Sequence, residues 1–252
     1  MSTLPLAGRT ALLATALALV GCQEVAPEPG PDPSERALPS ATATPESSVT
    51  PDVPLADARA ESDTLTVLFF GDSLTAGYGL SDPGLAYPAL VGAELDEAGV
   101  PARVVNAGVS GETSAGGLGR IAWTLRQNRP DVFVLALGAN DGLRGTDPSA
   151  TRENLSAILD AVEQAAPDAR LVVAGMEALP NYGADYTERF RAVFPAVAQA
   201  HGAAFIPFLL EGVAGVERLN QSDGVHPTAA GQRLIAETVA ETVVPVARRA
   251  AG

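Results

Sequence analysis

The 252-residue sequence contains no lysine, so all 16 of its basic residues are arginine. This absence excludes a P-loop, which needs a lysine on the β/γ-phosphates, and Schiff-base or pyridoxal-phosphate chemistry, which needs a lysine amine. One cysteine and two histidines, His201 and His226, cannot build a four-ligand zinc site, an iron–sulfur cluster or an intrachain disulfide. The chemistry of this protein must therefore run on hydroxyls, carboxylates, amides and at most two imidazoles.

Positive charge is scarce as well, because 30 acidic residues give the chain a formal net charge of -14. A protein that binds a phosphate backbone needs a basic face, so we expect no nucleic-acid partner. Hydrophobic residues make up 46% of the chain, which is enough for an ordinary globular core.

The first 22 residues resemble a bacterial lipoprotein signal peptide. Arg9 is followed by an apolar run from Ala11 to Val20, which is about half the ~20 residues that span a bilayer. The run ends in Leu-Val-Gly before Cys22, the only cysteine, and cleavage there would leave a diacylglyceryl-modified thiol that anchors the protein without spanning the membrane. The alternative is an ordinary secretory signal with a coincidental cysteine. We therefore expect a periplasm-facing, lipid-anchored protein of the bacterial cell envelope. Gln23 after the cysteine resembles the residue found in some lipoproteins that are sorted to the outer membrane, so we expect the anchor in the outer rather than the inner membrane.

Residues 23–61 are rich in proline, alanine, serine, threonine and acids, and they show no apolar period of 3.6 or 2. Such a segment cannot bury enough apolar surface to offset its ordering entropy, so we interpret it as a flexible linker. The remaining residues, 62–252, are predicted to form one domain.

In this domain, short apolar runs bounded by Gly, Asp, Asn or Pro predict buried strands at 65–70, 104–105, 132–137, 171–174 and 203–206. Longer stretches between them predict helices at 87–98, 114–128, 147–166, 187–201 and 228–249. Trp123 and Leu125 are expected to face the core from the second of these helices. Strands that alternate with helices predict an α/β fold with a parallel sheet covered on both faces.

Small polar segments follow the first three strands and precede the last helix: 71–79, 106–113, 138–142 and 223–227. Ligands of open parallel sheets bind outside the carboxyl ends of the strands, so we expect these segments to converge. They hold a hydroxyl, unhindered backbone amides, a carboxamide, and a carboxylate three residues before an imidazole. These are the groups that acyl transfer requires.

Each residue type has a predicted role. Ser73 is the nucleophile, which needs a base within hydrogen-bond reach, and His226 is the better placed imidazole. Asp223 at i-3 can accept the other ring N–H and fix the tautomer. The backbone N–H of Ser73, the N–H of Gly108 and the side-chain amide of Asn140 are the predicted oxyanion-hole donors.

Other residues near these segments receive structural roles. Asp72 and Asp141 are expected to order their loops by accepting from nearby N–H groups. His201 lies at a helix end before Gly202, where a surface position or a helix C-terminal cation is expected. The glycine-rich segment 77–79 lacks G-x-G-x-x-G spacing and a following lysine, so nucleotide binding is not expected.

With these motifs the chain resembles the SGNH (GDSL) hydrolase family. Ser73, Gly108, Asn140 and His226 stand in the four name-giving blocks, and Asp223 stands in the family's D-x-x-H, over residues 64 to the C-terminus. The strings at 71–78, 105–114, 140–145 and 179–183 look like the group of thioesterases, lysophospholipases and arylesterases in that family. The resemblance implies a flavodoxin-like three-layer α/β/α sandwich with a parallel five-stranded sheet, no metal and no cofactor. It also implies hydrolysis of small acyl esters, aryl esters, lysophospholipids or acyl thioesters.

The sequence departs from the group at Ala139, where a glycine commonly precedes the asparagine, and this methyl could narrow the site. Leu143, Leu179 and Tyr182, with Tyr186, lie in segments predicted to flank the acyl or aryl group, although packing alone would also explain them.

We therefore expect a monomeric serine carboxylic-ester hydrolase that works through a Ser-His-Asp triad and a covalent acyl-enzyme. One alternative is an O-acetylesterase of polysaccharide or peptidoglycan, because substrate choice depends on loops rather than on the fold. An alternative of another class is an inactive, ligand-binding relative of the same fold.

Overall fold

The computed structural model describes residues 64–252, so the predicted signal peptide, Cys22 and the linker lie outside the described residues. The strands are β1 (Leu65–Gly71), β2 (Ala102–Gly108), β3 (Val132–Ala136), β4 (Arg170–Ala174) and β5 (Ala204–Ile206). The α-helices are α1 (Ser73–Ala76), α2 (Tyr87–Glu97), α3 (Ser114–Gln127), α4 (Ala139–Arg144), α5 (Pro148–Ala165), α6 (Ala184–Ala200) and α7 (Ala229–Ala251). The 3₁₀ turns are η1 (Pro83–Leu85), η2 (Pro180–Tyr182) and η3 (Glu217–Leu219).

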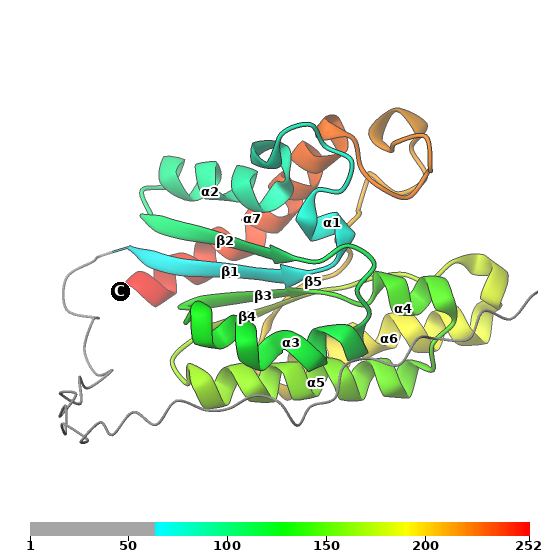
Figure 1. The fold of residues 1–252 in the computed structure, drawn as a ribbon, viewed down its shortest axis with the longest axis horizontal. Helices are drawn as coiled ribbons and strands as arrows, with labels where there is room; N and C mark the ends of the chain where they lie inside the picture. Colours follow the sequence, from blue (N-terminus) through cyan, green and yellow to red (C-terminus); the bar gives the residue numbers. More distant parts are fainter. Residues whose placement is uncertain (1–63) are drawn as a thin grey trace, which may run out of the picture. The chain divides into compact units, whose positions relative to one another are not determined.

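The strands form one parallel five-stranded sheet in the order β2-β1-β3-β4-β5. Helices α2 and α7 pack together on one face of the sheet, and α3, α5 and α6 cover the other (Figure 1). Because both faces are covered, the central strands are apolar throughout, and every residue of β3 is buried. This three-layer α/β/α arrangement confirms the predicted fold class.

The strand order reverses between β1 and β3. The chain runs from β1 outward to β2 and then crosses back to β3 on the other side of β1. In sheets of this order the ligand crevice lies beside that reversal, outside the carboxyl ends of the strands. The segments that follow β1 and β3 carry Ser73 and Asn140, and these two residues therefore meet at the crevice.

The main differences from the sequence prediction lie in strand β2 and in two short helices. Strand β2 spans Ala102–Gly108 rather than 104–105 because it is an edge strand, half-buried along its length, and its polar residues Arg103 and Asn106 interrupt the apolar run. The segments after β1 and β3 were predicted as loops, but they form the short helices α1 and α4.

The prediction for Trp123 is wrong, because its side chain is 60% exposed whereas that of Leu125 is buried. The buried face of α3 runs through Gly117, Ile121 and Thr124. Trp123 follows Ile121 by two residues, which places it about 200° around the helix axis, on the solvent side.

Within residues 64–252, no helix combines the length and the apolar character that crossing a bilayer requires.

Candidate active site

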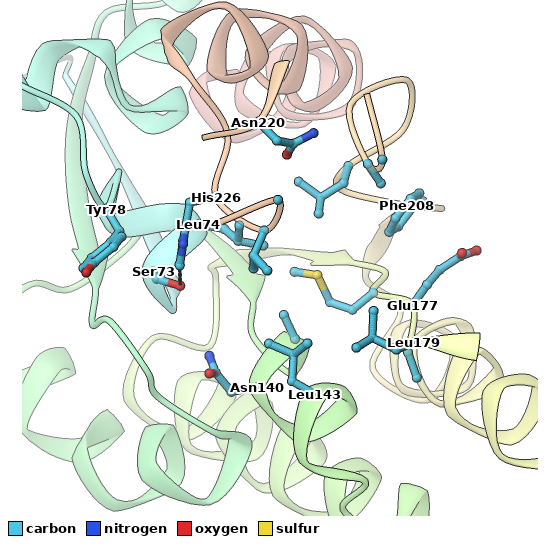
Figure 2. Close-up of a pocket in the computed structure, with 18 of the residues that line it drawn as sticks. Ser73, Leu74, Tyr78, Asn140, Leu143, Glu177, Leu179, Phe208, Asn220 and His226 are labelled. Carbon is cyan, nitrogen blue, oxygen red and sulfur yellow. Dashed lines mark hydrogen bonds between the residues drawn. The ribbon is translucent and has the colours of Figure 1, made fainter. Parts of the chain in front are cut away.

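The hydroxyl of Ser73 is presented at the carboxyl end of β1. The strand ends at Gly71, Asp72 caps α1, and Ser73 is the first residue of that helix. Ser73 Oγ lies 3.0 Å from His226 Nε2, although the two residues are 153 positions apart in the chain (Figure 2). A hydroxyl at hydrogen-bond distance from an imidazole can lose its proton to that ring as it attacks an electrophile.

The segment before α7 holds His226 and Asp223 together. Asp223 Oδ2 lies 2.7 Å from His226 Nδ1, and Asp223 Oδ1 accepts hydrogen bonds from the backbone N–H groups of His226 and Val225. The pKa of Asp223 is lowered to about 2 by these hydrogen bonds. The largest effect comes from the backbone N–H of His226, followed by the ring of His226 and the backbone N–H of Val225. The carboxylate therefore stays ionised, and it can fix the imidazole tautomer and stabilise an imidazolium.

Asn140 enters the site from α4, directly after β3. Its side-chain Nδ2 donates a 3.4 Å hydrogen bond to Asp72 Oδ2, and Asp72 Oδ1 accepts from the backbone N–H of Leu74. The Asp72 side chain is fully buried, and this burial raises its pKa to about 6 against the opposing effect of those hydrogen bonds. Asp72 therefore orders both its own turn and the carboxamide of Asn140.

Asp141 has the loop-ordering role that the sequence suggested. It is buried and accepts hydrogen bonds from the backbone N–H and the hydroxyl of Ser114 at the start of α3. This pairing joins α4 to α3 beside the pocket.

The structure does not bring Gly108 to the site as an oxyanion-hole donor. Its N–H donates to Asn106 Oδ1 at 3.0 Å, and Gly108 is not among the residues that line the pocket. A Cβ at this position would stand 2.3 Å from the backbone nitrogen of Ala76, so the glycine allows the end of β2 to approach α1. A glycine is therefore required at position 108 by close packing between β2 and α1, and not by the close approach of a substrate.

Gly111, a few residues further along, lies on the pocket wall instead. Its φ of 78° is in the left-handed region that favours glycine. Among residues 64–252, the backbone N–H of Gly111 donates no hydrogen bond to another residue. Segment 106–113 contains two glycines, Gly108 and Gly111, and the sequence alone did not show which of them supplies the N–H donor.

A pocket of about 680 Å³ opens beside Ser73, Asn140 and His226. Leu143 and Leu179 line it, as expected, but Tyr182 does not. The hydroxyl of Tyr182 instead donates to the backbone carbonyl of Leu143, so this tyrosine supports the wall from behind. Tyr186 likewise donates to the carbonyl of Thr146 and does not line the pocket.

Sequence reasoning missed several wall residues, all of them on turns or loops where no periodicity marks them: Tyr78, Met176, Phe208, Leu210, Ala214 and Val225. Tyr78 is the most informative, because its ring centroid lies 4.6 Å from that of His226. It belongs to segment 77–79, for which nucleotide binding was not expected. Its ring instead packs against the imidazole at one end of the pocket (Figure 2).

His201 lies outside this pocket, where it caps the end of α6. Its Nδ1 is 3.4 Å from Glu163 Oε2 and 4.0 Å from Asp160 Oδ1. Its contacts are thus with carboxylates of the neighbouring helix α5, in keeping with its predicted place at a helix end.

The site contains a hydroxyl, an imidazole and a carboxylate that are joined by hydrogen bonds, and a carboxamide and an apolar pocket lie beside them. This arrangement, on a flavodoxin-like fold, is of the serine-hydrolase type. Residues 69–234 match the GDSL-like Lipase/Acylhydrolase family. The chain belongs to this family, as its resemblance to SGNH (GDSL) hydrolases indicated.

Curated relatives and solved structures agree with this assignment. The chain is 42% identical over 181 residues to "Esterase TesA" of Pseudomonas aeruginosa, covering 72% of this chain and 89% of the relative. It is 38% identical over 187 residues to "Thioesterase 1/protease 1/lysophospholipase L1" of Escherichia coli, covering 74% and 86% respectively. A crystal structure of TesA superimposes with a TM-score of 0.68 at 41% identity, over 72% of this chain and 99% of that one.

Proposed function

We propose that this protein hydrolyses small carboxylic esters and thioesters of apolar acyl groups through a covalent acyl-enzyme on Ser73. That it hydrolyses ester bonds follows from its family and its relatives. The roles of individual residues are our proposal, supported above all by the contact of Ser73 Oγ with His226 Nε2 and of His226 Nδ1 with Asp223.

In the first half-reaction, Ser73 Oγ attacks the acyl carbon while its proton passes to His226 Nε2. The carbonyl π bond opens to an oxyanion, which collapses to expel the alcohol or thiol, and His226 returns the proton to that leaving group. In the second half-reaction, water attacks the Ser73 ester, giving its proton to His226. Collapse of this intermediate releases the carboxylic acid and restores the hydroxyl.

The oxyanion requires donors already in position. We assign the backbone N–H of Ser73, the Nδ2 of Asn140 and the backbone N–H of Gly111, which replaces Gly108 in this role. Supporting this set, all of these residues line the pocket beside the nucleophile. Such donors stabilise the transition state without reorganising during the reaction.

The lining of the pocket supports an acyl ester rather than a glycan as the substrate. Leucine, methionine, phenylalanine, alanine and valine side chains make most of its wall. An apolar wall binds hydrocarbon and offers few partners for the hydroxyl groups of a sugar chain, which would lose hydration there without compensation.

The test is a substrate panel of aryl butyrate, palmitoyl lysophospholipid, an acyl thioester and acetylated xylan, with the wild type and Ser73→Ala. We expect turnover of the first three and loss of several orders of magnitude in kcat for the variant. A preference for acetylated xylan would favour the O-acetylesterase. An unlabelled Ser73 after treatment with a fluorophosphonate probe would favour a binding module without turnover.

We also propose that Cys22 carries the lipid that anchors a monomeric domain, through the linker at 23–61, to the periplasmic side of the outer membrane. The support is the signal-like sequence that ends at the only cysteine of the chain. Labelling of the wild type, but not of Cys22→Ser, by an alkynyl fatty acid is the expected result. A mature wild-type protein that extracts into water without detergent would refute the anchor.

A further inference from the structure

The pocket has two chemically different ends. Ser73, His226 and Asn140 lie at one end, and Glu177, Leu179 and Phe208 lie at the other (Figure 2). An acyl chain attached to Ser73 would therefore run along an apolar wall toward the second end. Among residues 64–252, Glu177 is the only residue lining the pocket that bears a carboxyl group.

Glu177 follows β4 and is held by a residue of α6. Its Oε1 is 3.0 Å from the Nε of Arg191, and the two side chains are 40% and 65% exposed, respectively. An ion pair this exposed contributes little to stability, so fold stability does not explain a carboxylate at this position. The proposed reaction steps do not use it either.

A charged group at the end of an apolar groove affects short and long chains differently. Each methylene that reaches the apolar wall strengthens binding by about fourfold. A chain long enough to contact Glu177 must remove water from an ionised carboxylate and from its arginine partner, and this desolvation is unfavourable. The gain from added methylenes must therefore stop where the chain meets the carboxylate.

We propose that Glu177 sets the upper limit of the acyl length that this protein hydrolyses, by placing a hydrated carboxylate at the end of the pocket opposite Ser73. The inference rests on the proposed function and names a specificity-determining residue for it. Arg191 holds the carboxylate in place but does not itself line the pocket.

The experiment measures kcat/KM for p-nitrophenyl acetate, butyrate, octanoate, dodecanoate and palmitate, each below its critical micelle concentration. The variants are Glu177→Gln, which keeps the size and removes the charge, and Glu177→Leu, which makes the wall apolar. We expect the ratio of dodecanoate to butyrate activity to rise about tenfold in Glu177→Leu and less in Glu177→Gln. The change should appear in the KM for dodecanoate rather than in its kcat, because the contact binds ground state and transition state alike.

Arg191→Gln is the matched control, because it breaks the same ion pair and leaves the carboxylate on the wall. Its ratio should stay at or below that of the wild type. Urea-unfolding midpoints close to the wild-type value establish that the variants are folded.

Three results would overturn the inference. The first is an unchanged chain-length profile in Glu177→Leu. The second is a rise in Arg191→Gln equal to that in Glu177→Leu, which would trace the effect to loop mobility. The third is a change confined to the leaving group, such as altered discrimination between butyrylcholine and a neutral butyrate ester, which would place the alcohol at this end. Failure of the proposed function is distinguishable, because the wild type would then hydrolyse none of the esters.

Discussion

Replacing Asp72 by asparagine should make this protein more stable at neutral pH and less active. The Asp72 side chain is fully buried, and burial raises its pKa from an ordinary 3.8 to about 6. His226 and Asp141 are the other ionisable groups that act on it, His226 lowering and Asp141 raising the value. Asparagine has nearly the same shape and carries no charge to desolvate.

The size of the effect follows from linkage. Because the folded pKa lies above the unfolded one, the folded state holds its proton more tightly, and stability falls as pH rises from about 4 to about 6. The difference between the two pKa values corresponds to about 3 kcal/mol. Asp72→Asn should therefore gain up to about 3 kcal/mol above pH 6, while the gain disappears below pH 4.

Activity should move the other way. Asp72 Oδ1 accepts from the N–H of Leu74 and Oδ2 accepts from Asn140 Nδ2. An asparagine at position 72 that still accepts from the N–H of Leu74 through its Oδ1 points its NH₂ group toward Asn140. The carboxamide of Asn140 must then flip to accept that hydrogen bond, and its oxygen rather than its NH₂ group faces the oxyanion. We expect kcat to fall by about 10²–10³, as when one oxyanion donor is lost.

The assays are urea unfolding at pH values from 4 to 8 and kcat for an aryl butyrate. A variant that is less stable than the wild type at pH 8 would refute the reasoning. So would a stability difference that does not change with pH, because the argument depends on a charge that only the wild type carries.

Three further results are expected. Asn140→Ala should lower the kcat for aryl butyrate by about 10²–10³ with KM little changed, and an unaltered kcat would remove Asn140 from the mechanism. Asp223→Asn should lower kcat by about 10⁴, because the imidazole of His226 loses the acceptor that fixes its tautomer, and a loss below tenfold would argue against that role. Trp123→Ser should change the free energy of unfolding by less than about 0.5 kcal/mol, since the side chain is exposed. A loss of several kcal/mol would mean that the indole is covered.

The sheet was predictable from the sequence where strands are buried on both faces. The runs in β1 and β3 are continuous and apolar, so their positions were clear. Edge strand β2 was recognised only in its middle, because the exposed residues Arg103 and Asn106 interrupt its apolar run. Short helix α4 carries too few residues for a period to show.

The side chains of the proposed triad were predictable, because the sequence offers few residues that could serve as the base. Ser73, Asp223 and His226 could be paired from the sequence because the chain offers so few imidazoles, and the structure brings these three side chains together. The sequence could not separate Gly108 from Gly111 as a backbone donor, because the two glycines differ only in how the loop places their N–H groups. Leu143 and Leu179 were expected at the pocket, but most of the other wall residues were not identified because loop side chains follow no period.

The separation of 153 positions between Ser73 and His226 has a consequence for the life of the molecule. The proposed nucleophile stands at the start of α1, directly after β1, and the proposed base lies in the turn that precedes α7. A ribosome-bound or truncated chain that stops before residue 223 would hold the Ser73 hydroxyl without this base, and the proposed mechanism predicts that such a chain is inactive. Under that mechanism, esterase activity begins only after residues 223–226 have been synthesised and have folded against the start of α1.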